Sequence, residues 1–143
     1  MLKMQHVINR YMFVVINCLL LAMVLSSCAR SAQNAMHAAE NYEKLAQNAD
    51  YLGNILRNGL NEIASRNSLI TLVRGKGLLN AIVINCEEDS DLAWNICLKF
   101  RDYGLLAKPT HGNKIRLAPP LVITETQIQE CLNIIEKALN EFI

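Results

Sequence analysis

Apolar positions recur at three- and four-residue steps over 36–63, which is the spacing of one face of an amphipathic helix. These positions are Leu45, Ala49, Leu52, Leu56, Leu60 and Ile63. Two glycines, Gly53 and Gly59, lie inside this segment and lower its helix propensity by about 1 kcal/mol each relative to alanine. A polar cluster at 66–68 predicts the end of the helix.

Short strands are predicted after this helix, because apolar and β-branched runs alternate with turn residues. We expect strands over 69–73, 78–85, 105–107 and 114–118. The two glycines within 74–77 favour a turn that joins the first two strands into a hairpin. Pro109 is expected to end the third strand, and 110–113 to form the turn before the fourth.

Two further helices complete the pattern. The inner face of the first is predicted to hold Leu92, Ile96, Cys97, Phe100 and Tyr103. Acidic residues in its first turn would favour the helix dipole, and Gly104 is a C-terminal stop. The last helix begins at a capping box of Thr124 and Gln127, and its apolar face holds Ile128, Cys131, Leu132, Ile135, Leu139 and Phe142. This order predicts an α+β domain, a small antiparallel sheet covered by helices.

A hydrophobic segment precedes the predicted domain. Lys3 and Arg10 give a weakly basic start, 11–25 is almost uninterruptedly apolar, and small residues follow. This order is typical of a secretory signal peptide, and the run is shorter than the roughly 20 residues needed to cross a bilayer. We therefore expect a leader over 1–35, which acts as a signal peptide, lipoprotein signal or anchor, and a small domain over 36–143.

The end of the leader, 25–28, resembles a bacterial lipobox in which Cys28 would receive lipid. Two alternatives stay open for this segment. One is a short anchor with membrane association through 11–25, and the other is a reading frame joined by accident to the domain. A signal peptide, a lipoprotein signal or an anchor would each imply export or membrane anchoring.

Composition narrows the function classes. The 143 residues suffice for one domain. The net charge of +1, without a basic run or an aromatic ladder, argues against nucleic-acid binding. The five cysteines are widely spaced and form no C-x-x-C pair, so neither a disulfide scaffold nor a metal site is predicted. We interpret Cys86, Cys97 and Cys131 as reduced structural residues.

Three short segments offer weak candidate chemistry. The sequence 75–77 matches part of a phosphate loop, but a hairpin turn explains its glycines without a ligand. His111 is either an acid or base, or a solvated turn residue. The acidic cluster over 87–91 could attract a cation, yet a charged helix start accounts for it equally.

Arg116 is the more informative residue. Strand alternation places Ile115 and Leu117 on one face and Arg116 on the other. The rigid Pro119-Pro120 pair follows, so the arginine should have a fixed direction, and its planar fork suits a carboxylate. From these residues alone, Arg116 is either a carboxylate ligand or a solvated surface arginine.

Three runs resemble the C-terminal small domain of the ornithine aminotransferases, which are class-III pyridoxal-phosphate-dependent aminotransferases. They are V-R-G-K-G-L-L-N-A-I at 73–82, G-L-L-A-K-P-T-H-G at 104–112 and I-R-L-A-P-P-L at 115–121. The R-G-x-G-L and I-R-x-x-P-P-L patterns occur widely in class III, whereas L-L-A-K-P-T-H-G is much more particular to the ornithine enzymes. The resemblance covers about 41–143 and none of the leader.

The resemblance implies a specific reaction. The family transfers the δ-amino group of ornithine to 2-oxoglutarate, giving glutamate 5-semialdehyde and glutamate in proline and arginine metabolism. Its cofactor is pyridoxal phosphate, and Arg116 would bind the carboxylate of glutamate or 2-oxoglutarate. The segments 74–77 and 108–112 would be structural or site-lining. The family is cytosolic or found in the mitochondrial matrix, in contrast to an exported protein.

One departure from the family limits what this chain is expected to do alone. In the family, the Schiff-base lysine, the aspartate facing the pyridine nitrogen and the phosphate ligands lie in a large upstream domain, where this chain has its leader. We therefore expect no catalytic or cofactor-binding residue here, and no pyridoxal phosphate bound to this chain alone. The hypothesis is a truncated enzyme, inactive unless a partner chain supplies the large domain.

Two alternatives to a truncated enzyme remain. The chain could be an exported or membrane-tethered binding domain without catalysis, or a degenerate gene product. If the small domain stands alone, apolar surface that the large domain would cover should become exposed. Such surface favours self-association.

Overall fold

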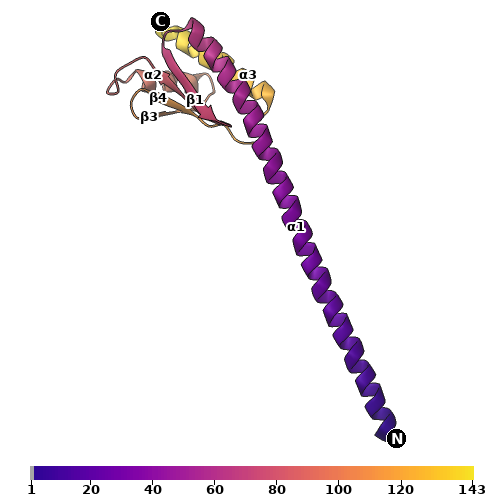
Figure 1. Cartoon of the computed structure of the whole chain (residues 1–143). Coiled ribbons are helices and arrows are strands. Elements are labelled where there is room, and N and C mark those ends of the chain that lie inside the picture. The colour runs from indigo at the N-terminus through magenta and orange to yellow at the C-terminus, as the bar shows by residue number, and fades with distance from the viewer. Residues whose placement is uncertain (1) are drawn as a thin grey trace. The chain divides into compact units, whose positions relative to one another are not determined.

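The computed structural model describes residues 2–143, with side chains for 22, 23 and 25–143. The chain divides into two compact units, Met1–Glu43 and Lys44–Ile143. Its elements (Figure 1) are α1 (Leu2–Arg66), β1 (Ile70–Lys76), β2 (Leu79–Ile84), α2 (Leu92–Asp102), β3 (Lys108–Thr110), β4 (Lys114–Leu117), α3 (Glu125–Leu139) and a 3₁₀ turn (Asn140–Phe142). The predicted α+β class is confirmed.

The first unit is helical from Leu2 onward. Met23, Leu25, Met36 and Tyr42 are exposed on it. Most of the predicted apolar segment 11–25 falls on residues whose side chains lie outside the described part, so its role as a signal or anchor stays a prediction. No helix in the described part of the chain is both long and apolar enough to span a membrane.

The part of α1 that belongs to the second unit carries the predicted apolar face, although the helix begins far before residue 36. Ala49, Leu52, Leu56, Leu60 and Ile63 are all buried. The helix ends at Arg66, inside the polar cluster that predicted its end.

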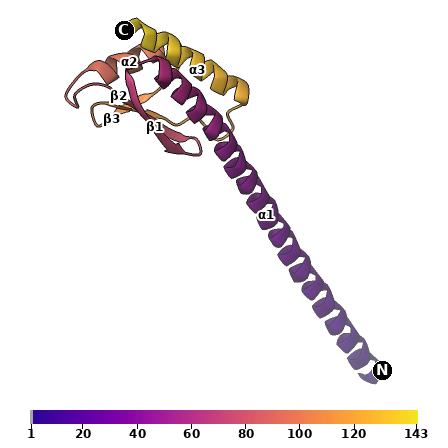
Figure 2. The same ribbon diagram turned by 45° about the horizontal axis from the view of Figure 1, so that its top comes forward.

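Close packing explains the two glycines of this helix. A Cβ atom on Gly53 would lie 1.9 Å from the carbonyl oxygen of Gly77, and one on Gly59 would lie 2.3 Å from Cδ1 of Leu132. The first glycine lets α1 approach the β1–β2 turn, and the second lets it approach α3, which lies beside this part of α1 (Figures 1 and 2). The glycines therefore permit tertiary contact that larger residues would block.

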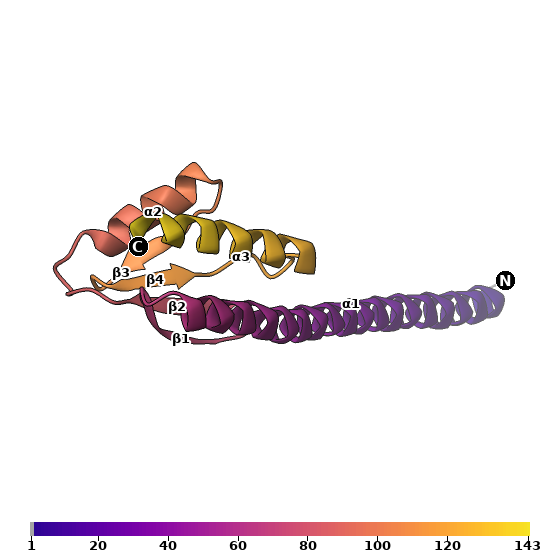
Figure 3. The same cartoon turned by 90° about the horizontal axis from the view of Figure 1, so that it is seen from above.

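The four strands form one antiparallel sheet in the order β1-β2-β4-β3. One face supplies core residues, namely Ile70, Ile82, Ile84, Ile115 and Leu117, all buried. Helices α2 and α3 lie on one side of the sheet (Figure 3), and their buried residues join the same core cluster. Side chains of the opposite face, such as Leu72, Arg74, Leu79 and Arg116, are exposed. This exposed face is where the candidate site lies.

Two predicted strand boundaries were wrong. β1 continues through Lys76, so the turn is reduced to Gly77-Leu78, and the third strand is Lys108–Thr110 rather than 105–107. Pro109 lies inside this strand instead of ending it. β3 is an edge strand that pairs only with β4, and a proline is tolerated at an edge because no ladder needs its missing N–H.

The ends of the helices agree only partly with prediction. Thr124 and Gln127 form the predicted capping box at the start of α3. In contrast, the first turn of α2 contains no acidic residue, and its N-cap Asp91 makes no side-chain capping bond. The acidic residues lie before the helix, and one of them, Glu88, pairs with Lys114 of β4.

The C-terminal end of the chain is held against α2. Tyr103 donates a hydrogen bond to the carboxylate of Glu141, and Lys99 Nζ lies 2.8 Å from Glu141 Oε2. Lys137 Nζ lies 4.0 Å from the centre of the Tyr103 ring. Hydrogen bonds from Lys99 and Tyr103 lower the pKa of Glu141, and the same contact raises the pKa of Tyr103.

Candidate functional site

An open hollow of about 570 Å³ lies on the exposed face of the sheet. Its lining comes from all four strands and the β3–β4 turn, and comprises Arg74, Gly75, Lys76, Leu79, Asn80, Ala81, Thr110, His111, Lys114 and Arg116. The four strands contain five basic residues, Arg74, Lys76, Lys108, Lys114 and Arg116, and no acidic residue. The hollow is therefore suited to an anion.

Arg116 has the orientation that alternation predicted. It is exposed between Ile115 and Leu117, which are 0% and 5% exposed. Its backbone pairs with Ala81 on β2 and Lys108 on β3, so neighbours on both sides fix its position. Among the described residues, no carboxylate pairs with its guanidinium. A bound anion would therefore not have to displace a described carboxylate of the protein from this guanidinium.

Arg57 of α1 holds the β1–β2 turn that borders the hollow. Its Nη1 donates to the carbonyl oxygen of Gly77 and to Oδ1 of Asn80, both at 2.8 Å, and its Nη2 donates to Oδ1 of Asn54 at 2.7 Å. Asn80 is 2% exposed, and its Nδ2 donates to the carbonyl of Gly77 at 3.1 Å. These bonds satisfy a buried amide, so they stabilise the hairpin.

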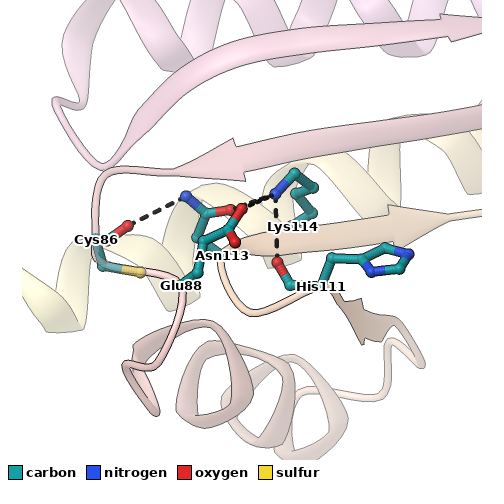
Figure 4. Close-up of polar contacts among 5 residues, drawn as sticks. All are labelled: Cys86, Glu88, His111, Asn113 and Lys114. Carbon is teal, nitrogen blue, oxygen red and sulfur yellow. Dashed lines mark hydrogen bonds and ion pairs between the residues drawn. The ribbon is translucent and has the colours of Figure 1, made fainter.

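A polar network holds the β3–β4 turn on the other side of the hollow (Figure 4). Asn113 Nδ2 donates to the carbonyl oxygen of Cys86 at 3.1 Å. Lys114 Nζ donates to Oε1 of Glu88 at 2.7 Å, to Oδ1 of Asn113 at 2.9 Å and to the carbonyl of His111 at 3.3 Å. The hydrogen bond from Lys114 lowers the pKa of Glu88. Glu88 therefore neutralises one of the basic residues that line the hollow.

The turn itself has an unusual backbone. His111 adopts a φ of 49°, and Gly112 a φ of 71°. A Cβ atom on Gly112 would lie 1.9 Å from the carbonyl oxygen of Glu88, so only glycine fits against this loop. His111 is exposed in the wall of the hollow. Its use as an acid or base stays a prediction.

The other candidate chemistry falls elsewhere. Gly75 and Lys76 belong to β1 and only Gly77 to the turn, so 75–77 does not form a phosphate loop. In the part of the chain that the structure describes, no group of three or more His, Cys, Asp or Glu residues could hold a metal ion. The acidic cluster at 87–91 instead supplies Glu88 to the network around Lys114.

The cysteines are free where their side chains are described. Burial raises the pKa of Cys97 to about 11 and also raises that of Cys131, which fits structural rather than reactive thiols. Cys86 is half-buried. Cys28 is exposed on α1, and its lipidation stays a prediction. Cys18 lies outside the residues with described side chains.

The described residues do not fit pyridoxal phosphate. A second pocket, of about 240 Å³, has a lining without a lysine or carboxylate: Leu56, Leu105, Leu106, Leu117, Ala118, Pro119, Pro120, Ile123, Ile128, Cys131 and Ile135. Lys99 and Lys114 are paired with carboxylates, and the other lysines with described side chains are exposed. An enzyme of this kind holds the coenzyme through an enclosed lysine and a partner for its ring nitrogen.

The place of Arg74 in the sheet was not predicted from the sequence. The resemblance implied only a structural or site-lining turn at 74–77, whereas the structure places Arg74 within β1, two strands from Arg116 in the same cross-strand row. Strand alternation alone shows that Arg74 and Lys76 share a face. Only the pairing of β2 with β4 brings that face next to Arg116.

Comparisons with known proteins agree with this geometry. The family described as Aminotransferase class-III matches residues 25–139. Rat mitochondrial ornithine aminotransferase is 58% identical over 100 residues, which cover 70% of this chain and 22% of the relative. The chain therefore spans about a fifth of the length of this curated relative.

Solved structures give the same result. Acetylornithine aminotransferase from Elizabethkingia anophelis is 58% identical with a TM-score of 0.69, over 71% of this chain and 27% of that one. The ornithine aminotransferase of Toxoplasma gondii, a structure with partial occupancy of pyridoxal phosphate at its active site, is 34% identical with a TM-score of 0.61, over 69% and 23%. The family resemblance is thus confirmed, and the chain belongs to the class-III aminotransferases.

Proposed function

We propose that this chain provides the carboxylate-binding small domain for the ornithine aminotransferase reaction. In that reaction, the δ-amino group of ornithine passes to 2-oxoglutarate, giving glutamate 5-semialdehyde and glutamate. The proposal depends above all on Arg116, which stands on a basic hollow without an acidic partner among the described residues. The identity with ornithine aminotransferases supports the choice of substrates.

The proposed role of Arg116 is to bind and orient. A guanidinium offers parallel N–H donors that match the two oxygens of a carboxylate. The buried neighbours Ile115 and Leu117 fix the strand, so little further ordering of the backbone is needed when a ligand binds. In this role Arg116 would hold the carboxylate of glutamate or 2-oxoglutarate at a fixed distance from the reacting carbon.

The chemistry of amino transfer would come from elsewhere in the assembly. Pyridoxal phosphate, when bound, supplies the electron sink of such reactions. Because the described residues do not form its site, we propose that residues outside them, or a partner chain with the large domain, hold the coenzyme. The chain alone would then transfer no amino group.

Titration of the purified 143-residue chain with 2-oxoglutarate tests the binding role. Nuclear magnetic resonance of the backbone amides should show shifts over 114–118, and Arg116→Gln should abolish them. Arg101→Gln is a matched control, because it removes the same charge from an exposed arginine of α2. Arg101 pairs with Asp102, outside the hollow. Shifts that survive Arg116→Gln, or that Arg101→Gln removes equally, would refute the role of Arg116.

A second measurement tests the division of labour. The chain is mixed with pyridoxal phosphate, ornithine and 2-oxoglutarate, and glutamate 5-semialdehyde is assayed. We expect no product above the rate of free coenzyme. Turnover by the chain alone would show that the coenzyme site lies within these residues.

The leader suggests an additional role in localisation. Cys28 is exposed on α1, and the residues before it resemble a lipobox, so we propose that the domain is tethered to a membrane through this cysteine. Mass spectrometry of the protein from its own cell would show a lipid on an N-terminal Cys28. A soluble protein that retains Met1 would exclude the tether.

A further inference from the structure

Two arginines, Arg74 and Arg116, line the hollow in one cross-strand row with Ala81 between them. The strand register pairs Ala81 of β2 with Arg74 of β1 on one side and with Arg116 of β4 on the other. Neighbouring strands lie about 4.8 Å apart, so the two arginine Cα atoms are about 10 Å apart. The small methyl group of Ala81 leaves space between the two long side chains, and all three residues line the hollow.

The positive charge in this hollow is only partly neutralised by the protein. Lys114 is paired with Glu88. No carboxylate in the described part of the chain pairs with Arg74, Lys76 or Arg116. Like charges that share one face of a sheet repel each other. An anion placed between the two arginines would convert this repulsion into two attractive interactions.

We propose that Arg74 is a second anion-binding residue of the hollow and holds, together with Arg116, the same carboxylate group. The identity of the ligand as a dicarboxylate rests on the function proposed above. The role of Arg74 rests on its place in the row. Because Arg74 and Arg116 flank Ala81 from opposite sides and line the same hollow, a carboxylate above Ala81 would be within reach of two guanidinium forks.

Lys108 provides a matched control. It pairs with Arg116 in the same row, from the β3 side, and carries the same charge as Arg74. However, it does not line the hollow. Its influence on a bound anion is therefore that of a nearby charge, which solvent and salt screen over about 8 Å at physiological ionic strength. A comparison of the two residues separates contact from general electrostatic attraction.

The experiment titrates the full chain with 2-oxoglutarate and with glutarate at about 0.15 M salt, using amide shifts to obtain Kd. We expect Arg74→Gln to raise Kd at least about fivefold, in line with the loss of one charge-assisted hydrogen bond. Lys108→Gln should raise it less than about twofold. Arg74→Lys should fall between the wild type and Arg74→Gln, because it keeps the charge but not the planar fork.

The outcomes are distinguishable. If Arg74→Gln binds as the wild type does, or if Lys108→Gln weakens binding as much as Arg74→Gln, the inference about Arg74 is wrong. If the Arg116→Gln variant binds normally as well, or the wild-type chain binds neither ligand, both the inference about Arg74 and the proposed function are wrong. Arg74 is exposed, so its variants should fold, and unchanged amide spectra away from the hollow would verify this.

Discussion

The hydrogen bonds of Arg57 make the stability of the β1–β2 turn testable. We predict that Arg57→Met lowers the free energy of unfolding of the 44–143 unit by about 2–4 kcal/mol. Methionine keeps most of the apolar stem of the side chain, so the change chiefly removes the guanidinium. The loss should also loosen the turn that borders the hollow.

The magnitude follows from the groups that would lose their donor. Oδ1 of Asn80 would lose its donor, Arg57, and Asn80 is only 2% exposed. An unsatisfied buried acceptor costs about 1–3 kcal/mol. The carbonyl of Gly77 would keep the bond from Asn80 Nδ2, so losing its second donor adds about 0.5–1.5 kcal/mol. The contact with exposed Asn54 should add little.

Urea unfolding provides the measurement. Trp94, the single tryptophan of the chain, lies on α2 and reports on this unit through its fluorescence, and linear extrapolation gives the free energy. Arg66→Met is the control, because its ion pair with Glu136 joins side chains that are 63% and 40% exposed and should contribute less than about 1 kcal/mol. If the free energy of unfolding falls by the same small amount in both variants, the buried network does not stabilise the turn as argued.

Three further predictions concern other contacts. Gly53→Ala should destabilise the domain by more than about 3 kcal/mol, because the added Cβ would lie 1.9 Å from a carbonyl oxygen of the β1–β2 turn; an unchanged urea midpoint would contradict this. Burial raises the pKa of Cys97 to about 11, so a thiol reagent near pH 8 should label exposed Cys28 far faster than Cys97. Mass spectrometry that shows equal labelling of the two would refute the assignment of Cys97 as an unreactive buried thiol. The hydrogen bond from Lys114 lowers the pKa of Glu88 below 4.5. The stability that this contact contributes is therefore present above pH 4.5 and is lost as the pH falls through the lower pKa of the folded state. Unfolding midpoints between about pH 3 and 7 should therefore depend less on pH in Glu88→Gln, and an identical dependence would exclude this contact as a source.

Features set by near neighbours in the sequence were predictable. The apolar face from Ala49 to Ile63 and the Thr124 capping box both depend on residues within one or two helical turns, and the structure contains both. The direction of Arg116 was predictable for the same reason, since strand alternation decides it. Local pattern was sufficient wherever the neighbours along the chain were also the neighbours in space.

Features set by distant contacts were not predictable in the same way. Gly53 reduces helix propensity, yet its reason for being glycine is a carbonyl 24 residues later, at Gly77. Pro109 is acceptable within β3 because of the position of that strand at the sheet edge. The hollow is the clearest case: a net charge of +1 gives no hint of it. Its arginines come together only when β2 pairs with β4 across the intervening α2.

The two outer strands of the sheet have a consequence for how copies of this protein can meet. Unpaired strand edges invite backbone pairing with another molecule, and short, irregular or proline-containing edges resist it. β3 has three residues with a proline at its centre, and β1 has a register shift between Ile70 and Leu72. Copies that associate through exposed Leu72 and Leu79 should therefore form dispersible oligomers, and the protein should not polymerise into continuous cross-β fibres.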